Sequence, residues 1–342
     1  RRHPQTSSGP LQVARHRLPK PAERYHPLPP KVSNLPSIVV AGSINQDLVI
    51  RSPRIPVPGE SVIGRDLSYV RGGKGANQAV ACARLGATTH FIGRVGADPF
   101  GESLIAGLIE NGVDTSMTRR DPHAPSGVAV ITIDPSGENA IVVAPGANAR
   151  CDACDIPAAL PAGTGAVLCQ LETSLPFVEA ALRAGRQAGA LTILDAAPAP
   201  SAPLSDPILS WVDLLTCNET EARVLLGMAP DEHTSDETLA DALATLGPAT
   251  LVLKLGERGG LAWRAGERVR VVPPRVHVVD TTGAGDAFTG ALAVALSEGL
   301  DLADSLAFAV HAGSLACTVL GAQPSMPSRA QVEQSLAADP HA

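Results

Sequence analysis

The chain has 342 residues, 44% of them hydrophobic, and a formal net charge of -7 at pH 7. This is enough apolar material for a substantial core, in one large domain or two ordinary ones, and it indicates a soluble globular protein. The acidic balance and the few aromatic residues, two Trp, two Tyr and five Phe, argue against a nucleic-acid surface, which needs a basic stripe or stacking rings.

The cysteines and the apolar runs bear on the cellular setting. Six cysteines are scattered through apolar or alanine-rich stretches, at positions 82, 151, 154, 169, 217 and 317. A chain of this size needs no disulfides, so we expect reduced thiols and a cytoplasmic location, or a nuclear one in a eukaryote. The CxxC pair at 151 and 154 lacks the second ligand pair that a zinc site needs. No apolar run reaches the ~18 residues of a membrane-spanning helix, so we expect no membrane insertion.

Residues 1–36 differ from the rest of the chain. They hold seven Arg or Lys, many prolines and one acidic residue, Glu23, and they show no apolar periodicity. This composition predicts a disordered, basic and proline-rich extension. An organelle transit sequence is the alternative, although the prolines disfavour the amphipathic helix of such segments. We expect the folded domain over residues 37–338.

Short β-branched runs alternate with Ala- and Leu-rich stretches from residue 37 onward. This alternation predicts an α/β fold with a mostly parallel central sheet and helices on both faces. The predicted sheet strands are 38–41, 89–92, 166–170, 191–194, 214–217 and 250–254. The predicted helices are 76–85, 99–111, 175–188, 219–226, 235–246, 286–298 and 303–320.

Two stretches, 61–70 and 126–143, break this rhythm. The second, SGVAVITIDPSGENAIVV, alternates apolar and polar residues around a Pro-Ser-Gly turn, which predicts an antiparallel hairpin. Antiparallel strands of this kind do not belong inside a parallel sheet. We therefore expect a small separate β-sheet, with strands within 44–70 and 126–143, that covers a site.

The stretch VRGGKGANQAVACARLG, residues 70–86, places three glycines and Lys74 before a helix that can begin at Asn77. Free backbone N–H groups at such a helix start favour an anion or a hydroxylated ligand. Lys74 is followed by Gly75, so the loop is not a Walker A motif, and its spacing does not match a dinucleotide fingerprint. A structural turn explains the glycines equally well.

Two further motifs allow either a ligand or a local structural role. Asn45 and Asp47 of GSINQDLVI follow the first predicted strand, where open α/β sheets bind ligands, and their side chains suit sugar hydroxyls. An Asx turn is the alternative. Asn218 and Glu221 of CNETEARVLLG stand at a helix start, where a capping box explains them and a water-bridged Mg²⁺ is the alternative.

The stretch DTTGAGDAF, residues 280–288, contains two aspartates. Its Gly283-Ala284-Gly285 leads into an apolar helix, and unobstructed amides at a helix start stabilise developing negative charge. Asp280 and Asp286 either share one ion or act separately, and Asp286 also suits the helix dipole. Capping alone does not require the two glycines, which favours a ligand site.

Gly72–Gly86 and Asp280–Ala291 resemble the two signatures of the ribokinase-like (phosphofructokinase B) family of carbohydrate kinases. CQLE, CNETEA, KLGERG and GAQPSMP follow in the order of that family, and the resemblance covers about residues 37–336. It implies a three-layer α/β fold with a small β-sheet lid. It also implies transfer of the γ-phosphate of ATP to the 5-hydroxyl of D-ribose, with Mg²⁺ and a monovalent activator, usually K⁺, in a homodimer formed through the lid.

The resemblance assigns roles to individual positions. Ribose would be bound by Asn45, Asp47, Gly73, Lys74, Gly75, Ala76, Asn77 and Glu172. The nucleotide would be lined by Asn218, Glu221, Lys254, Leu255, Gly256, Glu257, Arg258 and Gly259, with Mg²⁺ held by Glu221 through water. Gly283, Ala284 and Gly285 would form the anion hole, and Asp286 would be the catalytic base. The K⁺ site would comprise Asp280, Thr282, Ala316, Val319, Gly321 and Ser325. Where the family often has an Asn near adenine, this chain has Val310 and then His311, so His311 is the alternative contact.

Three other functions compete with this interpretation. A few pocket substitutions change the substrate of a kinase without changing its phosphate machinery, so deoxyribokinase, fructokinase and adenosine kinase activities are alternatives. A catalytically silent sugar-binding homologue would be marked by the loss of Asp286 or of the Gly-Ala-Gly, and both are present. An NAD-dependent oxidoreductase would need a dinucleotide fingerprint after the first strand, which the sequence lacks.

Overall fold

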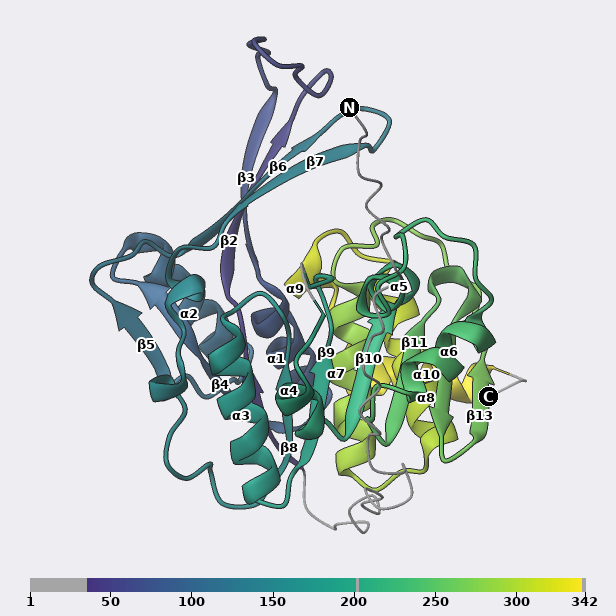
Figure 1. Ribbon diagram of the computed structural model, residues 1–342. Coiled ribbons are helices and arrows are strands. Elements are labelled where there is room, and N and C mark those ends of the chain that lie inside the picture. The colour runs from purple at the N-terminus through teal and green to yellow at the C-terminus, as the bar shows by residue number, and fades with distance from the viewer. Residues whose placement is uncertain (1–35, 201–202, 340–342) are drawn as a thin grey trace, which may run out of the picture.

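The computed structural model describes residues 36–200 and 203–339. The predicted extension therefore lies outside the described residues except for Pro36. The described chain forms two sheets, one of nine strands and one of four, with the smaller sheet rising from the body (Figure 1). Within these residues no helix is both long enough and apolar enough to cross a membrane.

The nine-stranded sheet has the order β13-β12-β11-β10-β9-β8-β1-β4-β5. Strand β12 pairs antiparallel with both β11 and β13 at one edge, and all other neighbours are parallel. The strands are β1 (Ser37–Ala41), β4 (Thr88–Gly96), β5 (Thr118–Asp121), β8 (Thr164–Cys169), β9 (Leu191–Asp195), β10 (Leu214–Asn218), β11 (Thr250–Lys254), β12 (Gly260–Arg264) and β13 (Glu267–Val271).

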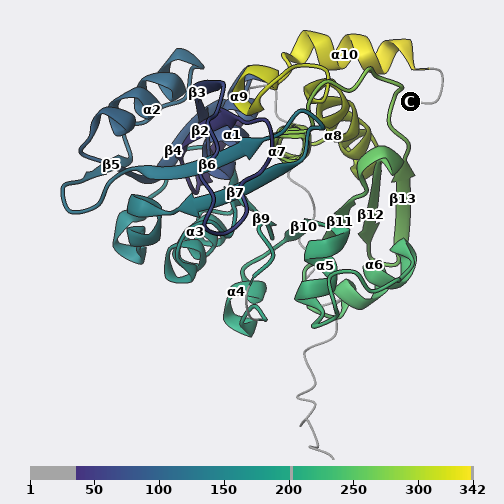
Figure 2. The same cartoon turned by 90° about the horizontal axis from the view of Figure 1, so that it is seen from above.

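Helices cover both faces of this sheet, as Figure 2 shows from above. Strand β1 is apolar on both sides: Ile38 and Val40 pack into one hydrophobic cluster, Val39 and Ala41 into the other. Such continuous apolar runs are typical of parallel strands buried on both faces. The helices are α1 (Lys74–Arg84), α2 (Pro99–Glu110), α3 (Leu175–Gln187), α4 (Asp206–Ser210), α5 (Glu219–Leu225), α6 (Asp236–Ala244), α7 (Ala284–Ser297), α8 (Leu302–Ala316), α9 (Ala322–Ser325) and α10 (Arg329–Ala338). The predicted three-layer α/β fold is confirmed.

The four-stranded sheet has the order β3-β2-β6-β7. Its strands are β2 (Asn45–Arg51), β3 (Asp66–Gly72), β6 (Gly127–Ile133) and β7 (Asn139–Ala144). Strands β6 and β7 form the predicted antiparallel hairpin, while β2 and β6 pair in parallel. Figures 1 and 2 both place this sheet over the half of the body that contains α1, α2 and β4. A separate small sheet is thus confirmed, and we call it the lid.

The structure corrects two predicted boundaries. Helix α1 begins at Lys74 rather than near Asn77, because Gly73 adopts φ +90° and lets the chain turn directly into the helix. Helix α8 ends at Ala316 instead of continuing to residue 320, and the carbonyl of Cys317 accepts hydrogen bonds from the amides of Val279 and Asp280. Strand β13 ends at Val271, since the prolines at 273 and 274 that follow cannot donate to a ladder.

Candidate active site

The predicted site residues gather at the carboxyl edge of the parallel strands. Strand β1 leads into Gly42 and Ser43, β8 into Gln170, β9 ends at Asp195 and β11 at Lys254. The carboxyl ends of parallel strands meet at one edge, where open α/β sheets bind ligands. The lid begins at this edge too, three residues after β1 ends.

The glycine loop holds Glu172 at the start of α1. The backbone N–H of Lys74 donates to Glu172 Oε2 at 3.1 Å, and Ser43 Oγ donates to the same oxygen at 2.5 Å. A Cβ at Gly75 would lie 2.6 Å from the backbone nitrogen of Ser43, so only glycine allows this close approach. Two predicted sugar contacts, the loop and Glu172, are therefore adjacent.

Asp286 is buried in the first turn of α7, with 6% of its surface exposed. Asn77 Nδ2 donates to Asp286 Oδ2 at 2.9 Å, and Gln78 Nε2 donates to Oδ1 at 3.0 Å. Burial raises the pKa of Asp286, and the nearby Lys74 ammonium opposes that rise. The carboxylate is thus held by two amides of α1, and a raised pKa makes it a better proton acceptor.

The predicted anion site lies at the start of α7. Gly283 is its N-cap and adopts φ +78°, a conformation that favours glycine, and the helix begins at Ala284. Lys254 Nζ lies 3.8 Å from the position that a Cβ would take at Gly285. Burial tends to lower the pKa of Lys254, but the carboxylates of Asp195 and Glu221 raise it overall. Helix amides and an ammonium group therefore face the same point, which suits an anion.

Lys74 is a basic residue on which four carboxylates of the site act. Burial opposes its ionisation, yet four carboxylates together raise its pKa: Asp286, Asp195, Glu172 and Glu221. A buried ammonium with several acidic neighbours remains charged at neutral pH.

Asn45 and Asp47 lie at the start of strand β2, where the lid joins the body. Asn45 is 4% exposed, and its Oδ1 accepts from Asn148 Nδ2 at 2.7 Å. Burial, and then the negative charge of Glu172, raise the pKa of Asp47 to about 7. A Cβ at Gly72 would lie 2.3 Å from Asp47 Oδ2, so the Asp47 carboxylate contacts the start of the glycine loop. Neither residue appears as an Asx turn, since both are within a paired strand.

Asn218 and Glu221 form a capping box at the start of α5. The N–H of Glu221 donates to Asn218 Oδ1 at 2.8 Å, and the N–H of Asn218 donates to Glu221 Oε2 at 2.8 Å. The structural explanation of this motif is therefore correct. It uses one carboxylate oxygen of Glu221, and the other oxygen is the one that a hydrated Mg²⁺ would approach.

The KLGERG turn joins β11 to β12 beside this cap. Leu255 is 3% exposed, Gly256–Arg258 forms one 3-10 turn, and Gly259 closes it. Arg258 pairs with Glu219 at 2.6 Å, in the first turn of α5. The predicted nucleotide-lining residues of this turn and of the Asn218 motif are thus neighbours.

The predicted K⁺ residues form a second cluster beside the anion site. Asp280 Oδ1 accepts from the N–H and the hydroxyl of Thr282, and Oδ2 accepts from the N–H of Gly321 at 2.8 Å. Ser325 is buried and donates to the carbonyl of Ala322 at 2.7 Å. Asp280 and Asp286 have no partner in common in these hydrogen bonds, so the two aspartates have separate surroundings. Over residues 36–200 and 203–339 no group of three or more His, Cys, Asp and Glu side chains could hold a metal ion.

Of the two residues predicted near adenine, His311 points to α10, and the adenine contact of Val310 stays a prediction. His311 is 1% exposed, with Nδ1 2.8 Å from Ser335 Oγ and Nε2 3.4 Å from Asp339 Oδ2, so it faces α10 and the residue that follows it. Val310 is 3% exposed and packs near Gly260 of β12. The two side chains have different neighbours because consecutive residues of a helix point in different directions.

Several residues of the site were absent from the sequence-based set. Asp195 Oδ1 accepts from Lys254 Nζ at 2.6 Å, and Asp195 Oδ2 accepts from Gln78 Nε2 at 2.9 Å. Gln170 Nε2 donates to Gln78 Oε1 at 2.5 Å. Gln170 and Asp195 were open to prediction, because polar residues at the carboxyl ends of buried strands are candidates for a ligand site.

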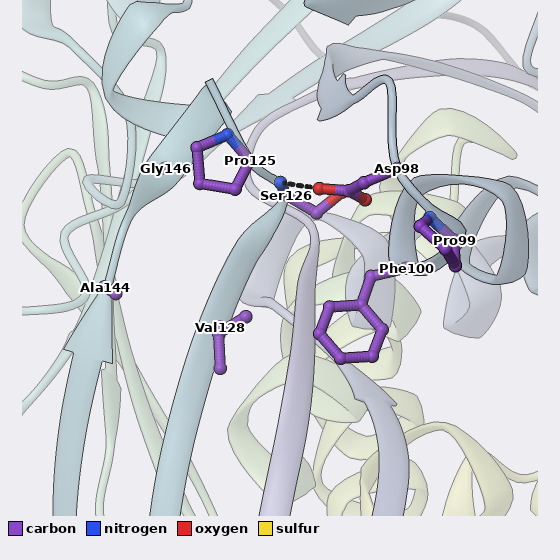
Figure 3. A pocket seen from close by; sticks show the side chains of 8 residues that line it. All are labelled: Asp98, Pro99, Phe100, Pro125, Ser126, Val128, Ala144 and Gly146. Atoms are coloured by element: carbon purple, nitrogen blue, oxygen red, sulfur yellow. Dashed lines mark hydrogen bonds between the residues drawn. The ribbon is translucent and has the colours of Figure 1, made fainter. Parts of the chain in front are cut away.

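A separate cavity lies at the base of the lid (Figure 3). It measures about 330 Å³ and is lined by Asp98, Pro99, Phe100, Pro125, Ser126, Val128, Ala144 and Gly146. Asp98 accepts from the N–H and from the hydroxyl of Ser126, both at 2.7 Å, which ties the start of β6 to the start of α2. These two hydrogen bonds fix the base of the lid on the body.

A buried carboxylate at a helix start with free backbone amides, at the sheet edge where the lid begins, suits an enzyme that transfers a phosphoryl group to a hydroxyl. A model of the pfkB family carbohydrate kinases matches residues 35–329, and the chain belongs to that family. The ribokinase of Bacillus subtilis is 39% identical over 308 residues, which cover 88% of this chain and 99% of the relative. The Haemophilus influenzae ribokinase is 36% identical, over 88% of this chain and 98% of its own. The structure of Arabidopsis thaliana ribokinase complexed with ribose and ATP superposes with a TM-score of 0.80 at 35% identity, over 89% of this chain and 99% of that chain.

Proposed function

We propose that this enzyme transfers the γ-phosphoryl group of ATP to the 5-hydroxyl of D-ribose, giving D-ribose 5-phosphate and ADP. The observation that carries the proposal is the placement of Asp286, which lies between the sugar-side amide Asn77 and the anion site at the start of α7. Ribokinase relatives over almost the whole chain, one of them solved with ribose and ATP, support the choice of sugar and nucleotide.

The chemistry follows from these positions. Asn45, Asp47, Glu172 and the glycine loop would bind the ribose hydroxyls and point the 5-hydroxyl at Asp286. As the bond from the 5-oxygen to the γ-phosphorus forms, the bond from that phosphorus to the β,γ-bridging oxygen breaks, and Asp286 takes the hydroxyl proton. In a loose transition state positioning and charge stabilisation provide most of the catalysis. The amides of residues 283–285 and the Lys254 ammonium would stabilise the developing charge.

The cations are part of the proposal. Mg²⁺ would be held through water by Glu221 and by the nucleotide phosphates, and it would neutralise phosphate charge. K⁺ would be held by Asp280, Thr282, Ser325 and the carbonyls of Ala316, Val319 and Gly321. These oxygen donors come from two segments joined by the Gly321–Asp280 bond, and oxygen ligands suit both ions. We also propose a cytoplasmic location, which fits the six free cysteines.

We propose a homodimer in which the lids of two subunits pack together. One face of the lid has an apolar row in register: Tyr69 pairs with Leu48, Leu48 with Val130, and Val130 with Val142. Tyr69 and Val142 are 63% and 71% exposed. The opposite face carries Asp47 and therefore faces the sugar site. Exposed apolar faces of this kind mark interaction surfaces.

The test is ADP release over a panel of ribose, deoxyribose, fructose and adenosine, with and without K⁺. We expect ribose to give the highest kcat/KM and K⁺ to increase it. Asp286→Asn should lose about 10²–10⁴-fold in turnover while ribose still binds, as calorimetry would measure. A faster turnover of fructose or adenosine than of ribose would refute the ribose assignment, and retained turnover in Asp286→Asn would remove Asp286 from its role.

A further inference from the structure

We propose that Asp195 is a positioning residue of the phosphoryl-transfer site, which joins Lys254 and the base Asp286 into one hydrogen-bonded unit. This inference rests on the phosphotransferase function proposed above, and it concerns a residue outside the two family signatures. Asp195 is the last residue of β9 and is 1% exposed.

Three elements converge on the Asp195 carboxylate. Lys254 Nζ, at the end of β11, donates to Oδ1 at 2.6 Å. Gln78 Nε2, on α1, donates to Oδ2 at 2.9 Å, and Thr289 Oγ1, on α7, donates to the same oxygen at 3.3 Å. Asp195 therefore connects the sheet to both helices that build the site.

The Gln78 amide makes this contact relevant to Asp286. Its single nitrogen has two hydrogens, and it donates one bond to Asp195 and one to Asp286 Oδ1 at 3.0 Å. Its oxygen is fixed by Gln170 Nε2, so the amide cannot flip without losing three bonds. Asp195 thereby fixes the orientation of the amide that holds the base.

The Lys254 contact connects Asp195 to the anion site. A buried ammonium needs a counter-charge, and removing one partner of such a pair is costly. Without the Asp195 carboxylate, the Lys254 ammonium loses the partner that holds it beside Gly285. It would then turn to Glu221, the other carboxylate that acts on it.

The charges around the base predict a pH readout. Lys74 of α1 lowers the pKa of Asp286, and Asp195 of β9 raises it, while Lys254 is faced by Asp195, Glu221 and Lys74. Asp195→Asn removes a negative charge and leaves Lys254 unneutralised. Both changes stabilise the ionised base, so the acid limb of kcat should move to lower pH.

The experiment compares Asp195→Asn, Lys254→Met and the double variant with the wild type. It measures kcat and KM on the panel substrate that the wild type phosphorylates fastest, and the melting temperature of each protein. We expect Asp195→Asn to lower kcat about 10²-fold, with a smaller effect on KM and an acid limb at lower pH. The losses of the two single variants should not multiply in the double variant, because Asp195 acts in part through Lys254. The control is Asp213→Asn, a buried aspartate paired with Arg186 at the opposite end of the sheet, which should lose stability and keep kcat.

The outcomes separate the two proposals. A wild type that prefers another sugar refutes only the ribose assignment, and one that phosphorylates nothing in the panel refutes both. Wild-type kcat and an unmoved acid limb in Asp195→Asn overturn the role of Asp195, as do losses that multiply in the double variant. Should Asp195→Asn not fold, Gln78→Met removes the amide that joins Asp195 to Asp286 and tests the same link; wild-type kcat for it overturns the proposal.

Discussion

Gly290 sets the distance between the two helices of the site, and a single methyl group tests it. Gly290 lies one turn after Asp286 on α7, and a Cβ there would be 2.7 Å from Ala81 Cβ on α1. Packed carbon atoms rest about 3.5 Å apart, so Gly290→Ala must separate the helices by about 0.8 Å. Overpacking costs about 1–3 kcal/mol and the better helix propensity of Ala returns about 1 kcal/mol. We expect a net loss of about 0–2 kcal/mol in the free energy of unfolding.

The effect on activity should be much larger than the effect on stability. The bonds from Asn77 and Gln78 to Asp286 are 2.9 and 3.0 Å long, and an extension of about 0.8 Å breaks both. A displacement of this size at a catalytic group costs about 10²-fold in rate. Steady-state kcat with saturating sugar and ATP, beside urea unfolding, measures the two effects separately.

Gly185→Ala is the matched control for Gly290→Ala. Gly185 is a helical glycine of α3 on the other face of the sheet, and a Cβ there would lie 2.8 Å from Val167 Cγ2. The steric cost is similar, but no residue of the site is on α3. Equal loss of kcat in both variants, or a folded Gly290→Ala with wild-type kcat, would refute this account of helix spacing.

Three further predictions concern the sugar side, the cation and the lid. The pKa of Asp47 is raised to about 7, so the stability that this residue contributes is full at low pH and is lost as the pH rises. Without ligand, the free energy of unfolding of the wild type should therefore fall between about pH 4 and about pH 7, and Asp47→Asn should make this fall smaller. The same variant should weaken ribose binding. Asp280→Asn should lower kcat and abolish activation by K⁺, which is measured as the ratio of kcat in K⁺ to kcat in a larger organic cation. An unchanged ratio would mean that K⁺ binds elsewhere. Val142→Lys should give a monomer in sedimentation, while Ile109→Lys, at a 58% exposed residue of α2, should not.

The fold was accessible from the sequence because its signals are local. Apolar runs of four to six residues between Ala- and Leu-rich helices give β1, β8 and β9, and the alternation around Pro-Ser-Gly gives the β6–β7 hairpin. The end of α8 was missed because the residues after Ala316 remain compatible with a helix. What ends it is a contact far along the chain, where the carbonyl of Cys317 accepts from Val279 and Asp280.

The site was accessible only in part, for the same reason. The glycine loop and the Gly-Ala-Gly turn are contiguous motifs, whereas Asn77 and Asp286 are separated by 209 positions and Lys254 and Asp195 by 59. No local pattern reveals such pairs. His311 illustrates the reverse error: its residue type suits adenine, but its ring faces Ser335 of α10. A residue type suggests a chemistry, and only the packing of its helix decides which way it points.

The charges of the site bear on the proposed lid, cations and anion hole together. Lys74 is faced by the carboxylates of Asp286, Asp195, Glu172 and Glu221, so the site without ligands has more acidic than basic groups. A triphosphate adds further negative charge, and its repulsion grows when a lid excludes water and lowers the local dielectric. We therefore expect acceptance of a nucleotide here to depend on cations and oriented amides. The proposed roles place the amides for the phosphate and the carboxylate for the proton at one helix start, while Lys254 remains paired with Asp195 nearby.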